Sequence, residues 1–134
     1  MRNIGILPIK SNSKRLANKN FRNFCGKPLW RWSFDTLIEC KLFDHIYLST
    51  DSPNLINLPY FENVSVVKRN KKLCQSNIHA IEVIFDILEN KKNNFSGEDN
   101  IMMLLPTSPF RFKDTIIRTC ELIEKSESAV IGIH

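Results

Sequence analysis

The sequence predicts an α/β fold, a three-layer sandwich built around a mostly parallel β-sheet. Apolar runs of strand length recur along the chain, and several are continuous rather than alternating, which is typical of strands covered on both faces. Segments of helix length, with apolar residues at helical spacing, separate these runs. The length of 134 residues fits one domain with its own buried core.

The first half of the chain supplies three of the expected strands. Residues 3–9 (NIGILPI) form a nearly unbroken apolar run, and residues 45–50 (HIYLST) and 64–68 (VSVVK) follow with strand-like composition. Residues 28–41 are expected to form a helix, because Pro28 suits a helix start and apolar residues recur at helical spacing. This apolar face consists of Leu29, Trp32, Phe34, Leu37 and Ile38.

A second helix is expected over residues 77–91, with Ser76 or Asn77 as its N-cap. The apolar residues at helical spacing in this segment are Ile78, Ile81, Ile84, Phe85 and Leu88. Residues 91–99 are polar and are expected to form a surface loop. The core, rather than a stacking platform for a ligand, is the expected place of Trp30, Trp32, Phe34 and Phe85.

The last part of the chain adds two strands and a helix. Residues 100–105 and 128–133 are expected strands, and residues 113–125 an expected helix with Asp114 near its positive end. Strands that alternate with helices predict βαβ units, and hence a Rossmann-like sandwich. Because the chain stops at His134, directly after an apparent core strand, we expect a fold that is truncated at its C-terminus.

The positive charge of the chain is local. The formal net charge is +5, yet residues 1–34 carry eight Lys and Arg and no acidic residue, while the remaining hundred residues sum to −3. A confined cluster favours a site for a polyanionic ligand over a general nucleic-acid-binding surface, so no nucleic-acid partner is expected. A solvated basic face is the alternative interpretation.

Cysteine spacing and hydropathy limit the other classes of function. The four cysteines show no CxxC spacing, so we expect reduced, partly buried thiols and no metal site. No stretch approaches the ~20 apolar residues of a membrane span, and Lys10 interrupts the first apolar run too early for a signal peptide. A cytoplasmic protein without a membrane partner is expected.

The segment that follows the first apolar run is the most informative one. Residues 10–20 combine four cations with serine and asparagine side chains and contain no acidic residue. In α/β proteins, ligands bind outside the carboxyl ends of the sheet strands, and this loop follows such an end. The loop is therefore expected to hold phosphates, with a triphosphate as the first hypothesis.

Several short motifs, in order along the whole chain, carry a resemblance to a known family. They are Lys10-Ser11-Asn12-Ser13-Lys14 with Lys19-Asn20, Gly26-Lys27-Pro28-Leu29, Leu42-Phe43-Asp44, Ser49-Thr50-Asp51, Arg69 with Leu73, and the segment from Leu104 to Arg111. In these motifs the chain resembles the acylneuraminate cytidylyltransferases, which are also called CMP-N-acetylneuraminic acid synthetases. The resemblance implies that residues 1–134 form the N-terminal part of a nucleotidyltransferase domain.

The resemblance also implies a reaction. Family members transfer CMP from CTP to a nonulosonic, nine-carbon sugar acid and release pyrophosphate, with Mg²⁺ as cofactor and as homodimers. The metal ligands of the family lie in a C-terminal part that this sequence does not contain, so catalysis by this chain is expected to be impaired. The alternative is a non-catalytic truncated homologue or pseudoenzyme that at most binds CTP.

Roles for individual residues follow from the resemblance. Phosphates are assigned to Lys10, Ser13 and Lys19, with Lys10 and Lys19 as the catalytic cations and Asn12 and Lys14 as further nucleotide contacts. Cytosine is assigned to Asn20 and Arg69 and to backbone groups around Ile78 and Ala80. The sugar acid is assigned to Leu105, Thr107, Ser108 and Arg111. A solvated position for Lys14, Arg15 or Arg111, and a turn or cap role for Asn20, remain alternatives.

Four positions depart from the family pattern. Lys10 replaces an arginine and Leu105 a glutamine, while Asn70 stands for a proline and Ser76 for an acidic residue. A lysine keeps the charge of an arginine but loses its planar, two-pronged donor. The sequence does not decide among neuraminic, legionaminic and pseudaminic acids, and the change at Leu105 is compatible with a non-standard sugar.

Overall fold

A four-stranded parallel sheet forms the centre of the molecule. The computed structural model describes residues 2–11, 16–57, 62–74, 79–91, 94–110 and 112–126. The strands are β1 (Asn3–Ile9), β4 (His45–Thr50), β5 (Val64–Lys68) and β6 (Asn100–Met103), in the order β5-β4-β1-β6. All neighbouring pairs are parallel. Four predicted strands are thus confirmed, the last of them two residues shorter than expected, while residues 128–133 lie outside the described residues.

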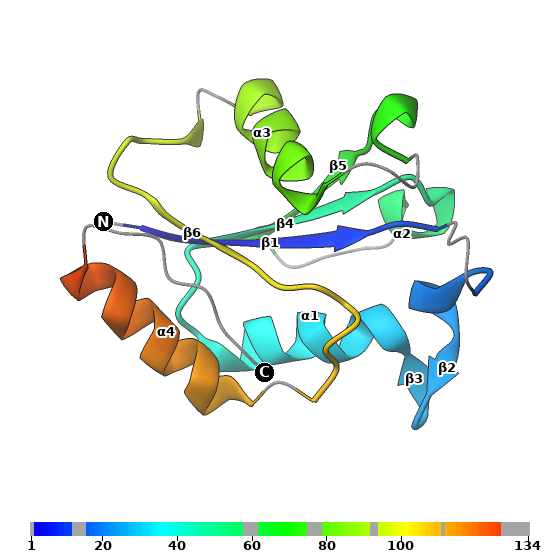
Figure 1. Cartoon of the computed structure of the whole chain (residues 1–134), viewed down its shortest axis with the longest axis horizontal. Helices are drawn as coiled ribbons and strands as arrows, with labels where there is room; N and C mark the ends of the chain where they lie inside the picture. Colours follow the sequence, from blue (N-terminus) through cyan, green and yellow to red (C-terminus); the bar gives the residue numbers. More distant parts are fainter. Residues whose placement is uncertain are drawn as a thin grey trace.

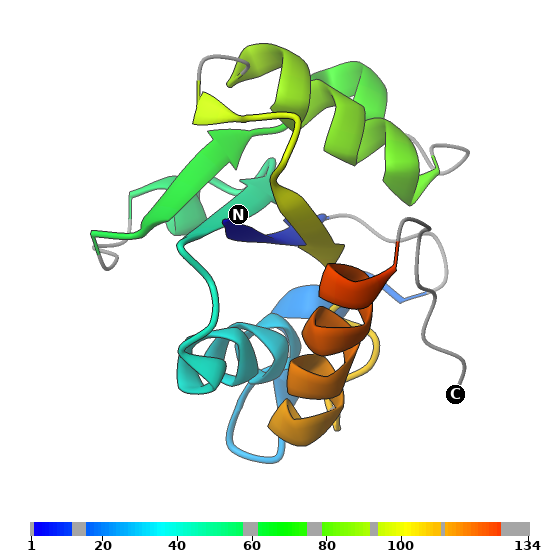
Figure 2. The same cartoon turned by 90° about the vertical axis from the view of Figure 1, so that its left-hand side faces the viewer.

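Helices cover both faces of this sheet (Figure 1). Helices α1 (Leu29–Cys40) and α4 (Lys113–Lys125) pack on one face, and α3 (Ala80–Asn90) packs on the other. This arrangement follows from chain direction, because β1 leads outward to β4 and β5 and the chain then returns to place β6 on the other side of β1. Right-handed crossovers in opposite directions place their helices on opposite faces. Figure 2 shows the same three layers from the side, which confirms the predicted sandwich.

The central strand β1 shows why its apolar run is continuous. Leu7 and Ile9 face α1 and α4, and Ile4 and Ile6 face α3. All four side chains are fully buried. A strand with both faces covered has no solvent side on which a polar residue would be favoured.

Helix α1 begins one residue later than predicted. Pro28 is its N-cap, and Trp30, Phe34 and Leu37 lie in the core. Trp32 is only half-buried, and its indole Nε1 donates a hydrogen bond to the carbonyl of Phe24 at 2.7 Å. Trp32 therefore ties α1 to the preceding hairpin instead of filling the core.

The prediction for the second helix was wrong in its start and in its buried face. α3 begins at Ala80, where the backbone N–H of His79 donates to Oε2 of Glu82 at 2.8 Å. Val83 and Ile87 face the sheet, whereas Phe85 is 62% exposed and is not a core residue. Phe85 lies about 200° around the helix from Val83. Apolar residues recur on several sides of this helix, so their periodicity alone does not indicate which side is buried.

The sequence also did not predict several short elements. A hairpin of β2 (Asn23–Phe24) and β3 (Lys27–Pro28) turns through Cys25 and Gly26, whose φ values of 51° and 100° suit a primed turn. The others are the 3-10 helices η1 (Lys19–Phe21) and η2 (Lys71–Cys74) and the one-turn helix α2 (Pro53–Ile56).

The four cysteines are free thiols. Cys40 and Cys120 are buried in the core that α1 and α4 share. Burial raises the pKa of the Cys40 thiol to about 11, so this thiol is protonated at neutral pH. Cys25 is exposed, contrary to the expectation that all four would be partly buried. Within the described ranges, no helix combines the length and the apolar character that crossing a membrane requires.

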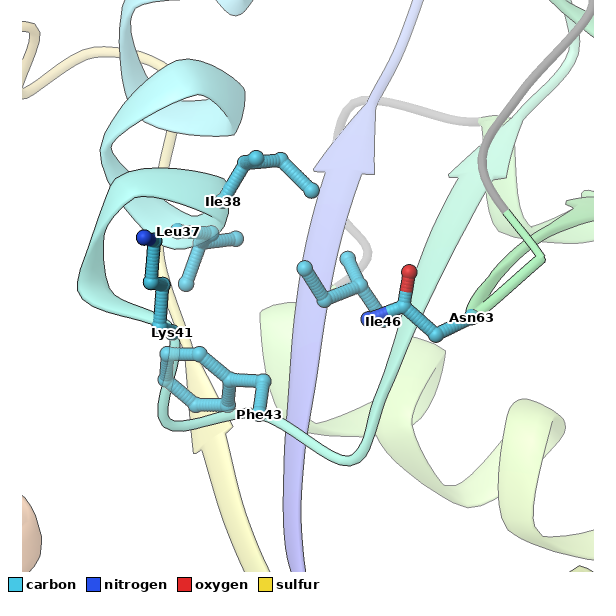
Figure 3. A pocket seen from close by; sticks show the side chains of 6 residues that line it. All are labelled: Leu37, Ile38, Lys41, Phe43, Ile46 and Asn63. Atoms are coloured by element: carbon cyan, nitrogen blue, oxygen red, sulfur yellow. The ribbon is translucent and has the colours of Figure 1, made fainter.

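An open cavity of about 380 Å³ lies at the amino-terminal edge of the sheet (Figure 3). Its lining comes from the end of α1, the segment that connects α1 to β4, the start of β4 and the residue before β5. It consists of Leu37, Ile38, Lys41, Phe43, Ile46 and Asn63. The carboxyl ends of the strands, where ligands bind in such sheets, are at the opposite edge.

Substituting Gly5 of β1 is expected to destabilise the fold. A Cβ at Gly5 would lie 3.3 Å from Cδ1 of Phe43 and 3.4 Å from Cγ1 of Ile46. We expect Gly5→Ala to lower the free energy of unfolding by about 1 kcal/mol, because buried neighbours must move to admit the methyl group. Gly97→Ala is the control, since a Cβ there meets nothing within 4 Å. Urea denaturation of both variants measures the difference, and equal midpoints would contradict the prediction.

Candidate functional site

The candidate site lies at the carboxyl edge of the sheet. Because the four strands are parallel, the residues that follow them meet at one edge, at the right of Figure 1. The strand order reverses beside β1, and such a reversal is where α/β sheets bind ligands. We call Lys10, Ser11, Asn20, Asp51 and Arg69 the carboxyl-edge cluster.

Asn20 is a buried member of this cluster. It lies in η1, is only 8% exposed, and its Nδ2 donates a hydrogen bond to the carbonyl of Lys10 at 2.9 Å. Because a carbonyl can only accept, this contact identifies which side-chain atom is the nitrogen. The other atom, Oδ1, is buried and has no hydrogen-bond partner among the residues that the structure describes. A buried acceptor without a donor costs free energy, so this atom is suited to receive a donor from a ligand.

Asp51 forms two hydrogen bonds with Ser11, the residue that follows Lys10. Its Oδ1 accepts from the backbone N–H of Ser11 at 2.8 Å, and its Oδ2 accepts from the Ser11 hydroxyl at 2.6 Å. Burial raises the pKa of Asp51, but the hydrogen bonds from Ser11 and the charge of Arg69 outweigh it and bring the pKa below its ordinary value. The carboxylate is therefore ionised at neutral pH.

Arg69 follows β5 and is 5% exposed. Its Nε donates to the hydroxyl of Ser49 and its Nη2 to the Ser49 carbonyl, both at 3.3 Å. Burial lowers the pKa of Arg69, and the nearby acidic groups, including Asp51 and Asp86, oppose this effect. On α3, Oδ2 of Asp86 is buried, and no described residue donates a hydrogen bond to it. The guanidinium thus lies within electrostatic range of two carboxylates, Asp51 and Asp86.

The structure brings several of the predicted nucleotide residues together. Burial and the charge of Asp51 raise the pKa of the Cys74 thiol, whereas the charges of Arg69 and Lys10 lower it. Asp51, Arg69 and Lys10 therefore all lie within electrostatic range of Cys74. Lys10 and Lys19 are half-buried. Ala80 is the first residue of α3 and is half-buried.

The predicted sugar segment lies on the other side of β1. After β6, Leu105 is 41% exposed, and its carbonyl accepts from the Ser33 hydroxyl of α1 at 3.5 Å. The backbone N–H of Ser108 donates to the carbonyl of Leu105 at 3.2 Å, which closes a turn that includes the exposed Thr107. Predicted site residues that lie outside the described ones are Asn12, Ser13, Lys14, Ile78 and Arg111.

Sequence reasoning missed the partners of these residues. Asp51 belongs to one of the motifs that carry the resemblance, but its contact with Ser11 joins residues 40 positions apart. Ser49 supports Arg69 from 20 positions away. The local sequence indicated these contacts only through the Ser49-Thr50-Asp51 motif, which places polar side chains at the end of β4.

The described residues do not form a ligand set for Mg²⁺. No group of three or more His, Cys, Asp or Glu side chains that could hold a metal occurs in the described parts of the chain. Both carboxylate oxygens of Asp51 already accept hydrogen bonds from Ser11. We therefore derive no chemical step through a metal from these residues.

The ionised Asp51 predicts a specific pH dependence of stability. Because its folded pKa is lowered, its contribution is present above the ordinary aspartate pKa of about 4 and is lost as the pH falls through the folded pKa. We expect the wild type to lose stability between pH 5 and about pH 3 more steeply than Asp51→Asn, by less than about 1 kcal/mol because the carboxylate is only partly buried. Urea denaturation at several pH values tests this, and parallel pH profiles would contradict it.

Comparisons with known proteins agree with this fold. CMP-N,N'-diacetyllegionaminic acid synthase from Legionella pneumophila is 28% identical over 134 residues, which cover 99% of this chain and 58% of that protein. Pseudaminic acid cytidylyltransferase from Campylobacter jejuni is 28% identical over 130 residues, which cover 96% of this chain and 56% of that protein. The chain thus spans about half the length of these curated relatives.

A solved structure shows the same architecture. The structure of CMP:2-keto-3-deoxy-manno-octonic acid synthetase complexed with CTP superposes with a TM-score of 0.74, at 12% identity, over 96% of this chain and 49% of that one. At this identity the likeness concerns the fold alone. The sequence profile of the family described as Cytidylyltransferase matches residues 4–131. The chain therefore belongs to the cytidylyltransferase family.

Proposed function

We propose that this chain binds CTP at the carboxyl-edge cluster and that the reaction it serves transfers CMP from CTP to a nonulosonic sugar acid. Membership of the cytidylyltransferase family supports the nucleotide. The names of two relatives, a legionaminic acid synthase and a pseudaminic acid cytidylyltransferase, support the class of acceptor.

The observation that carries the proposal is the unpartnered Oδ1 of Asn20. The exocyclic amino group of cytosine is a hydrogen-bond donor, whereas uracil presents a carbonyl acceptor at the same position. A fixed, buried acceptor such as Oδ1 of Asn20 pairs with the amino group of cytosine and repels the carbonyl of uracil. Sites that leave a buried polar group unpaired reject the wrong ligand strongly, so Asn20 can separate CTP from UTP.

The cations of the cluster suit the phosphates. Lys10 follows β1 directly and Lys19 begins η1, so the two half-buried ammonium-bearing residues flank the loop that the sequence assigned to phosphate binding. Charge-assisted hydrogen bonds from such groups are the strong contacts that phosphates require. Asn12, Ser13 and Lys14 remain predicted contacts of the same kind.

In the proposed reaction, a hydroxyl oxygen of the sugar acid attacks the α-phosphorus of CTP in line. A new O–P bond forms and the hydroxyl proton is released to solvent, while the bond from the α-phosphorus to the bridging oxygen breaks and pyrophosphate leaves. Lys10 and Lys19 would neutralise charge that develops on the phosphate oxygens. Leu105, Thr107, Ser108 and Arg111 are the proposed contacts of the sugar acid, and Mg²⁺ and a homodimer remain predictions from the family resemblance.

Calorimetric titration tests the nucleotide part of the proposal. The purified chain is titrated with CTP, UTP, ATP and GTP at one ionic strength, with and without Mg²⁺. We expect selective CTP binding that Lys10→Ala weakens at least tenfold, since it removes a charge-assisted contact. Lys125→Ala, at the exposed end of α4, is the control and should bind CTP as the wild type does. A folded chain that binds no nucleotide, or all four equally, would refute the proposal.

The transfer step has its own measurement. The chain is incubated with CTP, Mg²⁺ and each of the neuraminic, legionaminic and pseudaminic acids, and the CMP-sugar is detected by mass spectrometry together with released pyrophosphate. Product formed from one of the acids supports CMP transfer by this chain. CTP binding without product from any of them restricts the function of the chain alone to nucleotide binding.

A further inference from the structure

An acidic side chain lies where the proposed function places a triphosphate. Asp51 follows β4, the strand next to β1, and contacts Ser11, the neighbour of Lys10. A carboxylate repels phosphate oxygens, so a bystander at this position would weaken nucleotide binding. Its presence requires a compensating role.

Two sets of side-chain hydrogen bonds, which we call clamps, hold the backbone where the chain leaves β1. Asn20 of η1 donates to the carbonyl of Lys10 at 2.9 Å, and Asp51 accepts two hydrogen bonds from Ser11 at 2.8 and 2.6 Å. The clamps act on adjacent residues and come from different parts of the fold. Together they determine the backbone position from which the side chain of Lys10 extends.

The charge of Asp51 is partly balanced by neighbouring groups. Arg69 lies within electrostatic range of the carboxylate, and both Asp51 oxygens are occupied by donors from Ser11. A carboxylate engaged in this way presents little free negative charge to a ligand. Each carboxylate oxygen has one lone pair engaged by Ser11, through its backbone N–H or its hydroxyl.

We propose that Asp51 is a positioning residue for triphosphate binding, which acts by holding Ser11 through its N–H and hydroxyl groups rather than by its charge. The inference rests on the proposed function, because it assumes that Lys10 binds the phosphates of CTP. It assigns Asp51 neither to a metal nor to proton transfer.

Variants of the two partners separate hydrogen bonding from charge. Asp51→Ala removes both acceptors, and Ser11→Ala removes the hydroxyl. Asp51→Asn keeps the shape, can accept from the Ser11 N–H, and can donate to the Ser11 oxygen. Ser11→Thr keeps a hydroxyl. Asp114→Asn, at an exposed position of α4, controls for the loss of one negative charge.

We expect Asp51→Ala to weaken CTP binding about tenfold and Ser11→Ala to weaken it by a smaller factor, as hydrogen bonds to a charged group are lost. The double variant, with Asp51→Ala and Ser11→Ala together, should bind CTP no more weakly than Asp51→Ala alone. Both substitutions disrupt the same contact between Asp51 and Ser11. Asp51→Asn and Ser11→Thr should restore affinity to within about twofold of the wild type. Circular dichroism and urea denaturation establish that each variant is folded.

Three outcomes overturn the inference. If the wild type does not bind CTP, the proposed function fails and the positioning role fails with it. If the wild type binds CTP and Asp51→Ala binds at least as tightly, the positioning role alone is wrong. If Asp51→Asn binds as weakly as Asp51→Ala, the charge of Asp51 matters instead of its hydrogen bonds.

Discussion

Asn20→Ala is expected to reduce the affinity for CTP by about 100-fold and to remove the preference for CTP over UTP. The substitution deletes the unpartnered Oδ1 that is suited to the cytosine amino group, and it releases the clamp on the Lys10 carbonyl. Losing one base contact accounts for about 1–3 kcal/mol, and each 1.4 kcal/mol is a factor of ten in the dissociation constant. Calorimetric titration of wild type and variant with both nucleotides measures the two effects.

Two further variants sharpen this experiment. Asn20→Asp keeps an acceptor for the base but loses the donor to Lys10, so it should retain some preference for CTP at reduced affinity. Asn54→Ala, at an exposed position of α2, is the control for the loss of an amide and should leave binding unchanged. If Asn20→Ala still discriminates CTP from UTP as the wild type does, Asn20 does not recognise the base.

Phe34→Ala is expected to cost about 3–5 kcal/mol of folding stability. The Phe34 ring is 1% exposed, lies in the core that α1 shares with the sheet, and stacks obliquely on Trp30 with ring centroids 5.8 Å apart. Its removal leaves a cavity among side chains that cannot all collapse into it. Because domains are stable by only about 5–15 kcal/mol, much of the variant should be unfolded at physiological temperature.

Phe85→Ala is the matched control for this change. Its ring is 62% exposed on the outer side of α3, so the same substitution should change the free energy of unfolding by less than about 0.5 kcal/mol. Urea denaturation followed by tryptophan fluorescence compares the two variants. Equal destabilisation by both would show that Phe85 packs in the core, as its sequence spacing had suggested, and would contradict the observed orientation of α3.

The elements of the fold were largely predictable from local patterns. The runs 3–9, 45–50 and 64–68 coincide with β1, β4 and β5, and the segment 113–125 coincides with α4. A strand that is covered on both faces is favoured to be apolar at most positions, and this preference is visible without knowing its neighbours. The family membership was also recognisable, because its motifs lie in short stretches of sequence.

The pairing of residues was decided by the tertiary structure alone. Val83 rather than Phe85 faces the sheet because the crossover from β5 to β6 sets the rotation of α3, and the helix carries apolar residues on both sides. Likewise, Asp51 meets Ser11 because β4 lies beside β1 in register, which brings together the ends of two strands 40 residues apart. Local periodicity records how each segment folds, whereas the contacts that build the site depend on which strands become neighbours.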